Sequence, residues 1–131
     1  MISHKAVLYV DDDEDDRFLL TEAIRDMAPA LKVVEAENGI KALEYLKDAK
    51  NNLPCLVVLD INMPYMDGKQ TLERIKADQD LSGLDVVIFT SSENPNDKMF
   101  FKSKGVNMVV KPFDNKSLKQ IVKRFVDARC I

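Results

Sequence analysis

The sequence predicts an α/β domain in which five parallel strands form one sheet with helices on both faces. Short, β-rich apolar segments alternate with longer segments of helical periodicity, which is the pattern of βαβ units. Three of the apolar segments are almost uninterrupted, as expected for strands that helices cover on both sides. The length of 131 residues suits one domain with a sizeable core. We therefore expect residues 1–131 to form one domain, with its core at about 5–127 and no second, output domain.

Five strands and five helices are expected in alternation. The strands are predicted at 5–10, 31–36, 55–60, 84–90 and 107–111. The helices are predicted at 15–28, 39–50, 68–79, 95–104 and 115–129. The last helix has the clearest apolar stripe, formed by Leu118, Ile121, Val122, Phe125 and Val126.

Residues at the ends of the later helices agree with this assignment. Asn94-Pro95 offers an N-cap followed by proline at the first helical position, and Asp114 can cap the last helix. Gly105 can adopt the left-handed conformation just past the end of the fourth helix.

Composition excludes several classes of function. A net charge of −3 argues against a general nucleic-acid binder. We see no signal peptide and no apolar run of about 20 residues, so neither secretion nor a membrane span is expected. The spacing of Cys55 and Cys130 suggests neither a metal cluster nor a disulfide framework, and a cytoplasmic location is the simplest expectation. The only histidine, His4, lies in a predicted tail, where no role is expected for it.

Polar side chains follow four of the predicted strands. Asp11 and Asp12 follow the first strand, Asp60 the third, Thr90 the fourth and Lys111 the fifth. Because the carboxyl ends of parallel strands lie at one edge of a sheet, where ligands of open α/β folds bind, these groups should meet. Three carboxylates favour a divalent cation, and a hydroxyl with an ammonium group favours an anion. The chemistry indicated is metal-assisted phosphoryl transfer to or from a carboxylate.

Residues 11–16 form the densest run of charge in the chain. Carboxylates in a first helical turn are favoured by the helix dipole, which suffices to explain Asp15 and Asp16. It does not explain Asp11 and Asp12, whose mutual repulsion calls for a cation. Magnesium is expected, because it prefers oxygen ligands and binds phosphate.

Asp60 is the expected phosphoryl acceptor, since a carboxylate can form an aspartyl phosphate. Magnesium, Lys111 and Thr90 would neutralise the charge of the transferred group. Taken singly, Asp60 and Thr90 could be turn or cap residues, and Lys111 could be a solvated lysine. The Lys111-Pro112 bond could be cis, which would aim the lysine inward.

With these residues at these positions, the chain resembles the receiver domain of bacterial two-component response regulators, of the single-domain chemotaxis-regulator type. The resemblance rests on Val10-Asp11-Asp12, Leu59-Asp60-Ile61-Asn62-Met63-Pro64, Met66-Asp67-Gly68, Thr90-Ser91 and Lys111-Pro112-Phe113, and covers about residues 5–127. It implies a flavodoxin-like, doubly wound fold with strand order 2-1-3-4-5 and a cis Lys111-Pro112 bond.

The resemblance also implies a role for each site residue. Asp60 would accept a phosphoryl group from a sensor histidine kinase or a phosphotransfer protein. Asp12, Asp60 and the backbone carbonyl of Asn62 would hold Mg²⁺, with Asp11 helping through water. Thr90 and Lys111 would contact the phosphoryl group, and the small Ser91 would leave space for it.

The resemblance also implies which residues set the rate of dephosphorylation and which surface passes the signal to a partner. Asn62 and Ser92 would tune self-dephosphorylation. The fourth helix, fifth strand and fifth helix would form the switching face, which would act on a downstream protein target. The chain is expected to be a monomer or weak dimer. It is not expected to be an enzyme, apart from catalysing its own phosphorylation and dephosphorylation.

Two features depart from the family: the stretch 105–111 is one residue shorter than the usual pattern, and position 108 lacks the usual aromatic residue. Where many members carry an aromatic switch residue, this chain has Met108, so switching is expected to run through Thr90 while Met108 repacks with Phe100 or Phe101.

Three rival functions remain. A magnesium-dependent phosphohydrolase with an aspartyl-phosphate intermediate would need a second carboxylate just after Asp60, and Ile61-Asn62 supplies none. A nucleotide-binding module would need a glycine-rich turn after the first strand. The corresponding turn in this chain is acidic. A receiver that acts without phosphorylation is disfavoured by the complete site.

Overall fold

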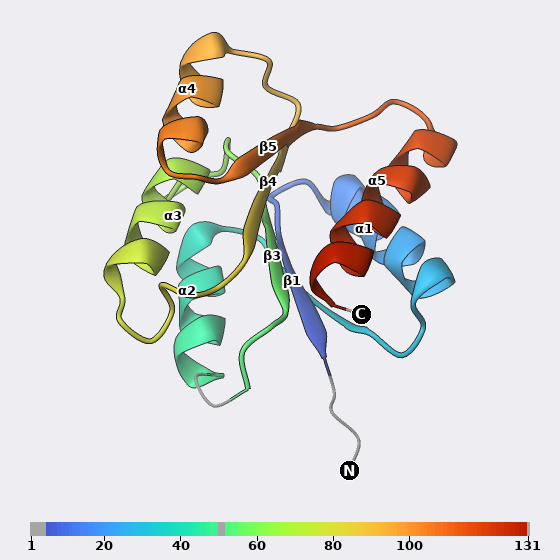
Figure 1. The fold of residues 1–131 in the computed structure, drawn as a ribbon, viewed down its shortest axis with the longest axis horizontal. Helices are drawn as coiled ribbons and strands as arrows, with labels where there is room; N and C mark the ends of the chain where they lie inside the picture. Colours follow the sequence, from blue (N-terminus) through green and yellow to red (C-terminus); the bar gives the residue numbers. More distant parts are fainter. Residues whose placement is uncertain (1–4, 50–51, 131) are drawn as a thin grey trace.

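The computed structural model describes residues 5–49 and 52–130, where five strands alternate with five helices (Figure 1). The strands are β1 Ala6–Val10, β2 Lys32–Ala36, β3 Leu56–Leu59, β4 Val86–Thr90 and β5 Asn107–Val110. The helices are α1 Glu14–Met27, α2 Gly39–Asp48, α3 Gly68–Ala77, α4 Pro95–Ser103 and α5 Asn115–Arg129. The predicted elements are confirmed, with bounds that differ by at most two residues. His4 and residue 50, the expected end of the second helix, lie outside the described residues.

All strand pairs of the sheet are parallel, and the strand order is β2-β1-β3-β4-β5, as the resemblance implied. The chain moves outward from β1 to β2 and then crosses to β3 on the other side of β1. The strand order therefore reverses between β1 and β3, where the carboxyl ends open onto the position at which such folds bind ligands.

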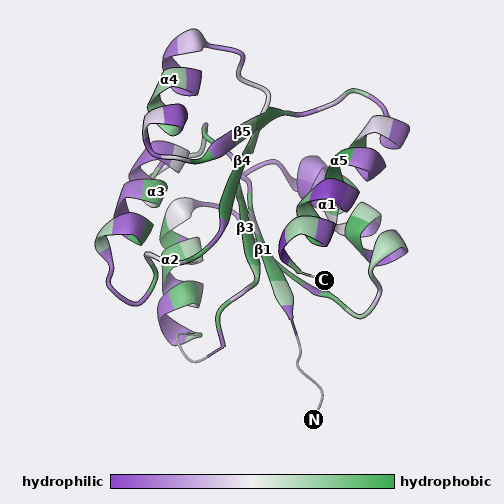
Figure 2. Ribbon diagram, in the orientation of Figure 1, coloured by the Kyte–Doolittle hydropathy of each residue, from purple (hydrophilic) through white to green (hydrophobic). Residues whose placement is uncertain are grey.

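Alternate residues of the central strands fill two separate cores, one on each face of the sheet. On one face, Leu8, Val10, Val57, Leu59 and Ile88 pack with buried residues of α2, α3 and α4. On the opposite face, Val7, Tyr9, Val58, Val87 and Phe89 pack with α1 and α5. Figure 1 shows these two helical layers, and Figure 2 shows the hydrophobic strands between them.

Side-chain caps fix the starts of the helices. Asp13, Asn38, Asp67, Asn94 and Asp114 each accept a backbone N–H from the first turn of α1 to α5, respectively. Asn94, Pro95 and Asp114 act as the sequence predicted, and Gly105 has the expected positive φ of 72°. Among the described helices, none has the length and apolarity needed to cross a bilayer.

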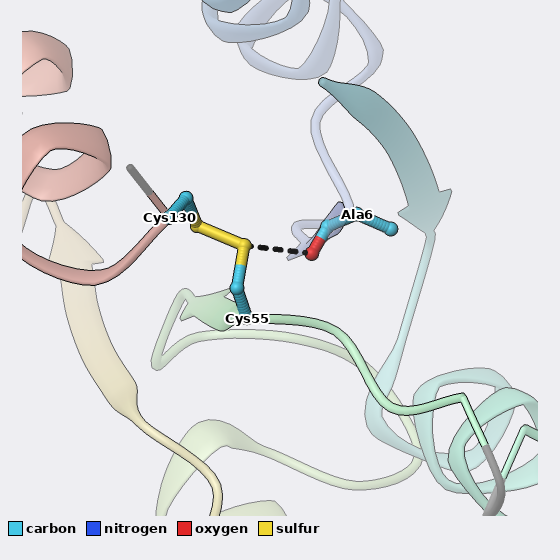
Figure 3. Close-up of a disulfide and its surroundings, with 3 residues drawn as sticks. All are labelled: Ala6, Cys55 and Cys130. Carbon is cyan, nitrogen blue, oxygen red and sulfur yellow. Dashed lines mark hydrogen bonds between the residues drawn. A yellow bond between two sulfur atoms is a disulfide. The ribbon is translucent and has the colours of Figure 1, made fainter. Parts of the chain in front are cut away.

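Two expectations about covalent geometry are wrong. Cys55 and Cys130 form a disulfide, although their separation of 75 residues gave no sign of one (Figure 3). The fold explains the pairing, because α5 returns toward the amino ends of the strands and its last turn meets the start of β3.

The Lys111–Pro112 bond is trans, not cis. The lysine is already aimed inward by the strand pairing, since its backbone N–H donates to the Thr90 carbonyl at 2.7 Å.

Candidate functional site

Three carboxylates gather at the carboxyl edge of the sheet, the edge formed by the C-terminal ends of the strands. Asp11 and Asp12 follow β1 and Asp60 follows β3, and one oxygen of each lies within 4.8 Å of the others. Asp11 and Asp60 are buried, whereas Asp12 is exposed. The predicted convergence of these residues is therefore present, with one carboxylate facing solvent.

Lys111 lies among the carboxylates and contacts two of these three. Its Nζ donates to Asp11 Oδ2 at 2.6 Å and to Asp60 Oδ2 at 3.1 Å. A third hydrogen bond of 2.7 Å goes to Asp16 Oδ2, in the first turn of α1. The three protons of the ammonium group thus have three carboxylate acceptors.

Asp11 is held by neighbours that leave it little freedom. Its Oδ2 also accepts a hydrogen bond of 2.6 Å from the hydroxyl of the fully buried Tyr9, and its Oδ1 accepts the backbone N–H of Asp13 at 2.9 Å. Tyr9 and Asp11 are two residues apart, so strand alternation puts their side chains on the same side. Burial, reinforced by the charge of Asp11, raises the pKa of Tyr9, which therefore stays a hydrogen-bond donor.

The pKa values of Asp60 and Lys111 are both raised. Burial raises the pKa of Asp60, and the charge of Asp11 adds to this, although Lys111 opposes both. Burial alone would lower the pKa of Lys111, but its hydrogen bonds to Asp11 and Asp16 and the charge of Asp60 raise it overall. Lys111 is therefore a permanent cation beside Asp60.

Thr90, Ser91 and Ser92 follow one another from the end of β4. Thr90 is fully buried, and its Oγ1 accepts the backbone N–H of Ser92 at 3.2 Å. Ser91 is exposed. The hydroxyl of Ser92 donates to Asp97 Oδ2 at 2.6 Å, and the other oxygen of Asp97 lies 2.7 Å from Lys69 Nζ. Ser92 is thus held by a chain of contacts that reaches from α4 to the first turn of α3.

The loop from β3 to α3 begins at Asp60 and folds back against it. Asn62 lies in this loop and is exposed. Gly68, the first residue of α3, donates its N–H to the Ile61 carbonyl at 2.7 Å. Asp60 Oδ1 accepts the N–H of Ile61 at 2.7 Å, which fixes the orientation of the carboxylate.

Met108 is partly buried, on the face of the sheet covered by α4. It packs on the same core as the fully buried Phe101, and Phe100 also lies against this core. Met108, Phe100 and Phe101 therefore belong to the same core, and the repacking of Met108 stays a prediction.

The residues at the carboxyl edge fit a hard divalent cation. They supply clustered carboxylate oxygens, the preferred ligands of magnesium, and the exposed Asp12 leaves the cluster open to water. Without a cation, Lys111 is the positive charge that offsets their repulsion.

Three contributions were missed at the sequence level. Asp16 was interpreted as a helix-dipole carboxylate, yet it binds Lys111, and nothing in the sequence distinguishes it from Glu14 or Asp15. Tyr9 could have been found from its position two residues before Asp11. The pairing of Lys69 with Asp97 depends on how α3 packs beside α4, so local sequence could not show it.

Comparison with known proteins agrees with this geometry. The sequence profile of the response regulator receiver domain matches residues 7–123. Chemotaxis protein CheY-3 of Vibrio cholerae is 34% identical over 115 residues, which cover 87% of this chain and 85% of that protein. The matched relatives differ in size, and this chain spans only 15% of the sensor histidine kinase CheAY of Helicobacter pylori, at 28% identity.

Solved structures have the same fold. The phosphorylated cyanobacterial phytochrome response regulator RcpA superposes with a TM-score of 0.84 at 31% identity, covering 95% of this chain and 92% of that one. The Mn²⁺-bound form of response regulator Rcp1 gives a TM-score of 0.81 at 27% identity, covering 94% and 92% of the two chains. Family, fold and strand order agree, and the chain belongs to the receiver domains of two-component response regulators.

Proposed function

We propose that this chain is a phosphorylation-dependent switch in which Asp60 accepts a phosphoryl group from a sensor histidine kinase or a phosphotransfer protein. The observation that carries this proposal is the meeting of Asp11, Asp12 and Asp60 with Lys111 at the carboxyl edge of the sheet. A related structure, that of RcpA, is described as phosphorylated, which also supports the proposal.

In the proposed reaction a carboxylate oxygen of Asp60 attacks the phosphorus atom of a phosphohistidine. The new O–P bond forms as the P–N bond breaks, and the histidine nitrogen leaves with the electron pair. Such transfers need positioning and charge neutralisation more than covalent help. Lys111 would move from its carboxylate partners to a phosphoryl oxygen, assisted by the hydroxyl of Thr90, while Ser91 leaves space for the group.

The chain would use Mg²⁺ as its cofactor. Asp11, Asp12, Asp60 and the backbone carbonyl of Asn62 would hold it, and its charge would offset that of the carboxylates and the phosphoryl oxygens. A related receiver structure, that of Rcp1, holds Mn²⁺, another divalent cation.

Output is proposed to be a protein–protein interaction of this domain. Phosphorylation would favour a conformation in which Thr90 moves toward the phosphoryl group and Met108 repacks. The size of the response depends on the difference in stability between the two states once Asp60 is phosphorylated. Asn62 and Ser92 would tune hydrolysis of the aspartyl phosphate.

The wider setting is also a proposal. The chain would work in the cytoplasm, as a monomer or weak dimer, without binding nucleic acid or membranes. It would catalyse only its own phosphorylation and dephosphorylation.

The central test uses the purified protein with magnesium and acetyl phosphate, followed by intact mass measurement. The wild type should gain one phosphoryl group, and Asp60→Asn should gain none. Asp12→Ala should lose both metal binding and labelling. Asp15→Ala is the matched control, because Asp15 is an exposed carboxylate of the same acidic run, and it should label normally.

Three outcomes would contradict the proposal. Labelling of Asp60→Asn at Asp11 or Asp12 would assign the acceptor elsewhere. A wild type that stays unlabelled with every donor, phosphohistidine proteins included, would indicate a receiver that acts without phosphorylation. Rapid turnover of phosphate esters would instead favour a phosphohydrolase.

A further inference from the structure

The Cys55–Cys130 disulfide lies at the end of the sheet opposite the phosphoryl-acceptor site. Cys55 directly precedes β3, whereas Asp60 directly follows this strand. Five residues of extended chain place the two about 17 Å apart. The disulfide is therefore separate from the carboxylate cluster, and none of the roles proposed above uses it.

The disulfide joins two elements that are far apart in the sequence. Cys130 caps the end of α5, so the bond fastens the last turn of this helix to the start of β3 (Figure 3). Phe125 and Val126 pack the same end of α5 against the core that contains Val58 of β3. One covalent bond and a set of apolar contacts thus hold the end of α5 in the same place.

The pair has no competitor within the chain. The sequence contains two cysteines, and their Cα atoms lie 5.4 Å apart, a separation that permits a disulfide. Oxidation within one chain therefore has a single product, and reduction returns the same two thiols.

The reduced state also fits its surroundings. Cys55 Sγ lies 3.2 Å from the carbonyl oxygen of Ala6 (Figure 3). A disulfide sulfur has no proton to donate, but a Cys55 thiol would find this acceptor already in place. The Ala6 carbonyl would therefore give a reduced Cys55 a hydrogen-bond acceptor on β1.

A cleft lies on the Cys130 side of the bond, where Cys130 itself is 4% exposed. The cleft, of about 290 Å³, is lined by Cys130, by Met27 at the end of α1, by the following residues Ala28 to Leu31, and by Lys5. Lys5 is one of the residues that line this cleft, and its positive charge would favour the approach of an anionic thiol. Cys55 itself is only partly buried.

We propose that Cys55 and Cys130 form a redox modification site, which exchanges with low-molecular-weight thiols of the glutathione class. A thiolate attacks one sulfur, so that a mixed disulfide forms and the other cysteine leaves as a thiolate. A second small thiolate attacks the mixed disulfide, releasing the second cysteine thiolate and the oxidised small disulfide. The reverse sequence re-forms the bond and reduces that disulfide.

The disulfide would regulate the proposed phosphorylation switch from the end of the sheet opposite Asp60. In the cytoplasm, where we propose that the chain acts, a persistent disulfide is uncommon and a redox-sensing one is the usual kind. Opening the bond leaves the last turn of α5 held by packing alone. Because α5 belongs to the proposed output face, reduction would make the end of α5 more mobile at this face, while the structure around Asp60 would stay the same.

The test equilibrates the purified full chain with mixtures of reduced and oxidised glutathione. After acid quenching, free thiols are alkylated with N-ethylmaleimide and counted by intact mass. We expect species with no free thiol and with two free thiols to dominate. The ratio of the dithiol protein to the disulfide protein should be proportional to the squared concentration of reduced glutathione divided by the concentration of oxidised glutathione. Cys55→Ser and Cys130→Ser are matched controls, each expected to carry one glutathione and no internal bond.

Three results would overturn the proposal. Two free thiols at every ratio would mean that the bond does not form. Glutathione on both cysteines as the final oxidised product would mean that they do not pair. A bond that resists excess reduced glutathione in the folded protein would make it a fixed structural crosslink.

Hydrogen exchange supplies the structural readout. Reduction should speed exchange in the last turn of α5 and lower the Tm by roughly 10 °C, while exchange in α3 serves as the internal control. Unchanged exchange in α5 would show that the bond does not fasten the helix. None of these measurements uses a phosphodonor, so their failure would leave the Asp60 proposal untouched.

Discussion

The backbone of Gly68 lies so close to that of Asp60 that a side chain at position 68 would force the backbone to shift. A Cβ at Gly68 would come within 2.3 Å of the Asp60 carbonyl oxygen and 2.8 Å of Ile61 Cα. Both neighbours are backbone atoms, which cannot swing aside as the end of a side chain can. The start of α3 therefore sets the position of the loop that follows Asp60.

Gly68→Ala should consequently lower the stability by about 1–3 kcal/mol, the usual effect of overpacking. It should also slow labelling of Asp60, because the loop carrying Asn62 must shift. Gly83→Ala is the matched control, since a Cβ there would meet no heavy atom within 4 Å, and it should change neither quantity. Urea denaturation and the labelling time course measure both. If the two variants behave alike, the close approach has no consequence.

Tyr9→Phe should destabilise the protein by about 1–3 kcal/mol, because it removes a buried hydrogen bond to a charged carboxylate. Lys111 and the Asp13 N–H still bind Asp11, so the fold should survive. Tyr65→Phe removes the hydroxyl of an exposed tyrosine and should have no measurable effect. Equal unfolding midpoints for Tyr9→Phe and the wild type would show that the hydrogen bond contributes nothing net.

The raised pKa of Asp60 gives a prediction about pH. When the folded pKa of an acid is raised, the folded state binds more protons than the unfolded chain, so stability falls as pH rises from the ordinary pKa through the folded pKa. At neutral pH and without metal, the charged Asp60 therefore destabilises the folded state. Asp60→Asn should be more stable than the wild type there, and the difference should shrink as pH falls through the folded pKa.

Urea denaturation in a chelator at several pH values measures this difference. Asp85→Asn, which removes one carboxylate at an exposed position, is the control. A less stable Asp60→Asn at neutral pH would mean that the ion pair with Lys111 outweighs the effect of burial.

The link from Lys69 through Asp97 to Ser92 predicts an effect on phosphoryl lifetime. Lys69→Met should let the pKa of Asp97 rise toward its ordinary value, since the hydrogen bond from Lys69 is the main cause of its lowering. Ser92 then loses its fixed partner, and the decay rate of the aspartyl phosphate should change in the same direction as in Ser92→Ala. Lys41→Met breaks an ion pair with Glu37 in which both side chains are exposed, and should leave the decay rate unaltered.

The stability cost of Lys69→Met should stay below about 1 kcal/mol, so that a changed rate reflects the position of Ser92 and not unfolding. Carbon-detected NMR titration of Asp97 and loss of the phosphorylated mass over time supply the two readouts. A shifted Asp97 pKa with unchanged decay would separate Ser92 from the path of the attacking water.

Much of this structure could be predicted from the sequence, because the relevant signals are local. Apolar runs fixed the strands, and the polar residues directly after them marked the carboxyl edge of the sheet. The pairing of Cys55 with Cys130 could not be predicted in this way, because it depends on where α5 ends relative to β3. The same holds for Asp16, whose contact with Lys111 spans 95 residues. Contacts between elements, unlike strand ends, have no signature in local spacing.

Switching through Thr90 and Met108 gives the last prediction. Thr90→Ala removes a buried hydroxyl whose oxygen accepts the N–H of Ser92, but it leaves Asp60 and Lys111 in place. Labelling should therefore persist in this variant, while amide chemical shifts in α4 and β5 no longer respond to it. Met108→Ala should retain labelling and lose about 1–3 kcal/mol of stability, less than a fully buried methionine would, because Met108 is only partly buried.

Two-dimensional amide NMR spectra with and without the phosphodonor measure the response over residues 95–111. Met99→Ala is the control for Met108→Ala, because Met99 is 69% exposed on the neighbouring helix α4 and makes little packing to lose. A full spectral response in Thr90→Ala would exclude the hydroxyl as the coupling group. If phosphorylation leaves the wild-type spectrum of this face unmoved, the output surface must lie elsewhere, and the exposed Phe18 and Leu19 of α1 are the next place to look.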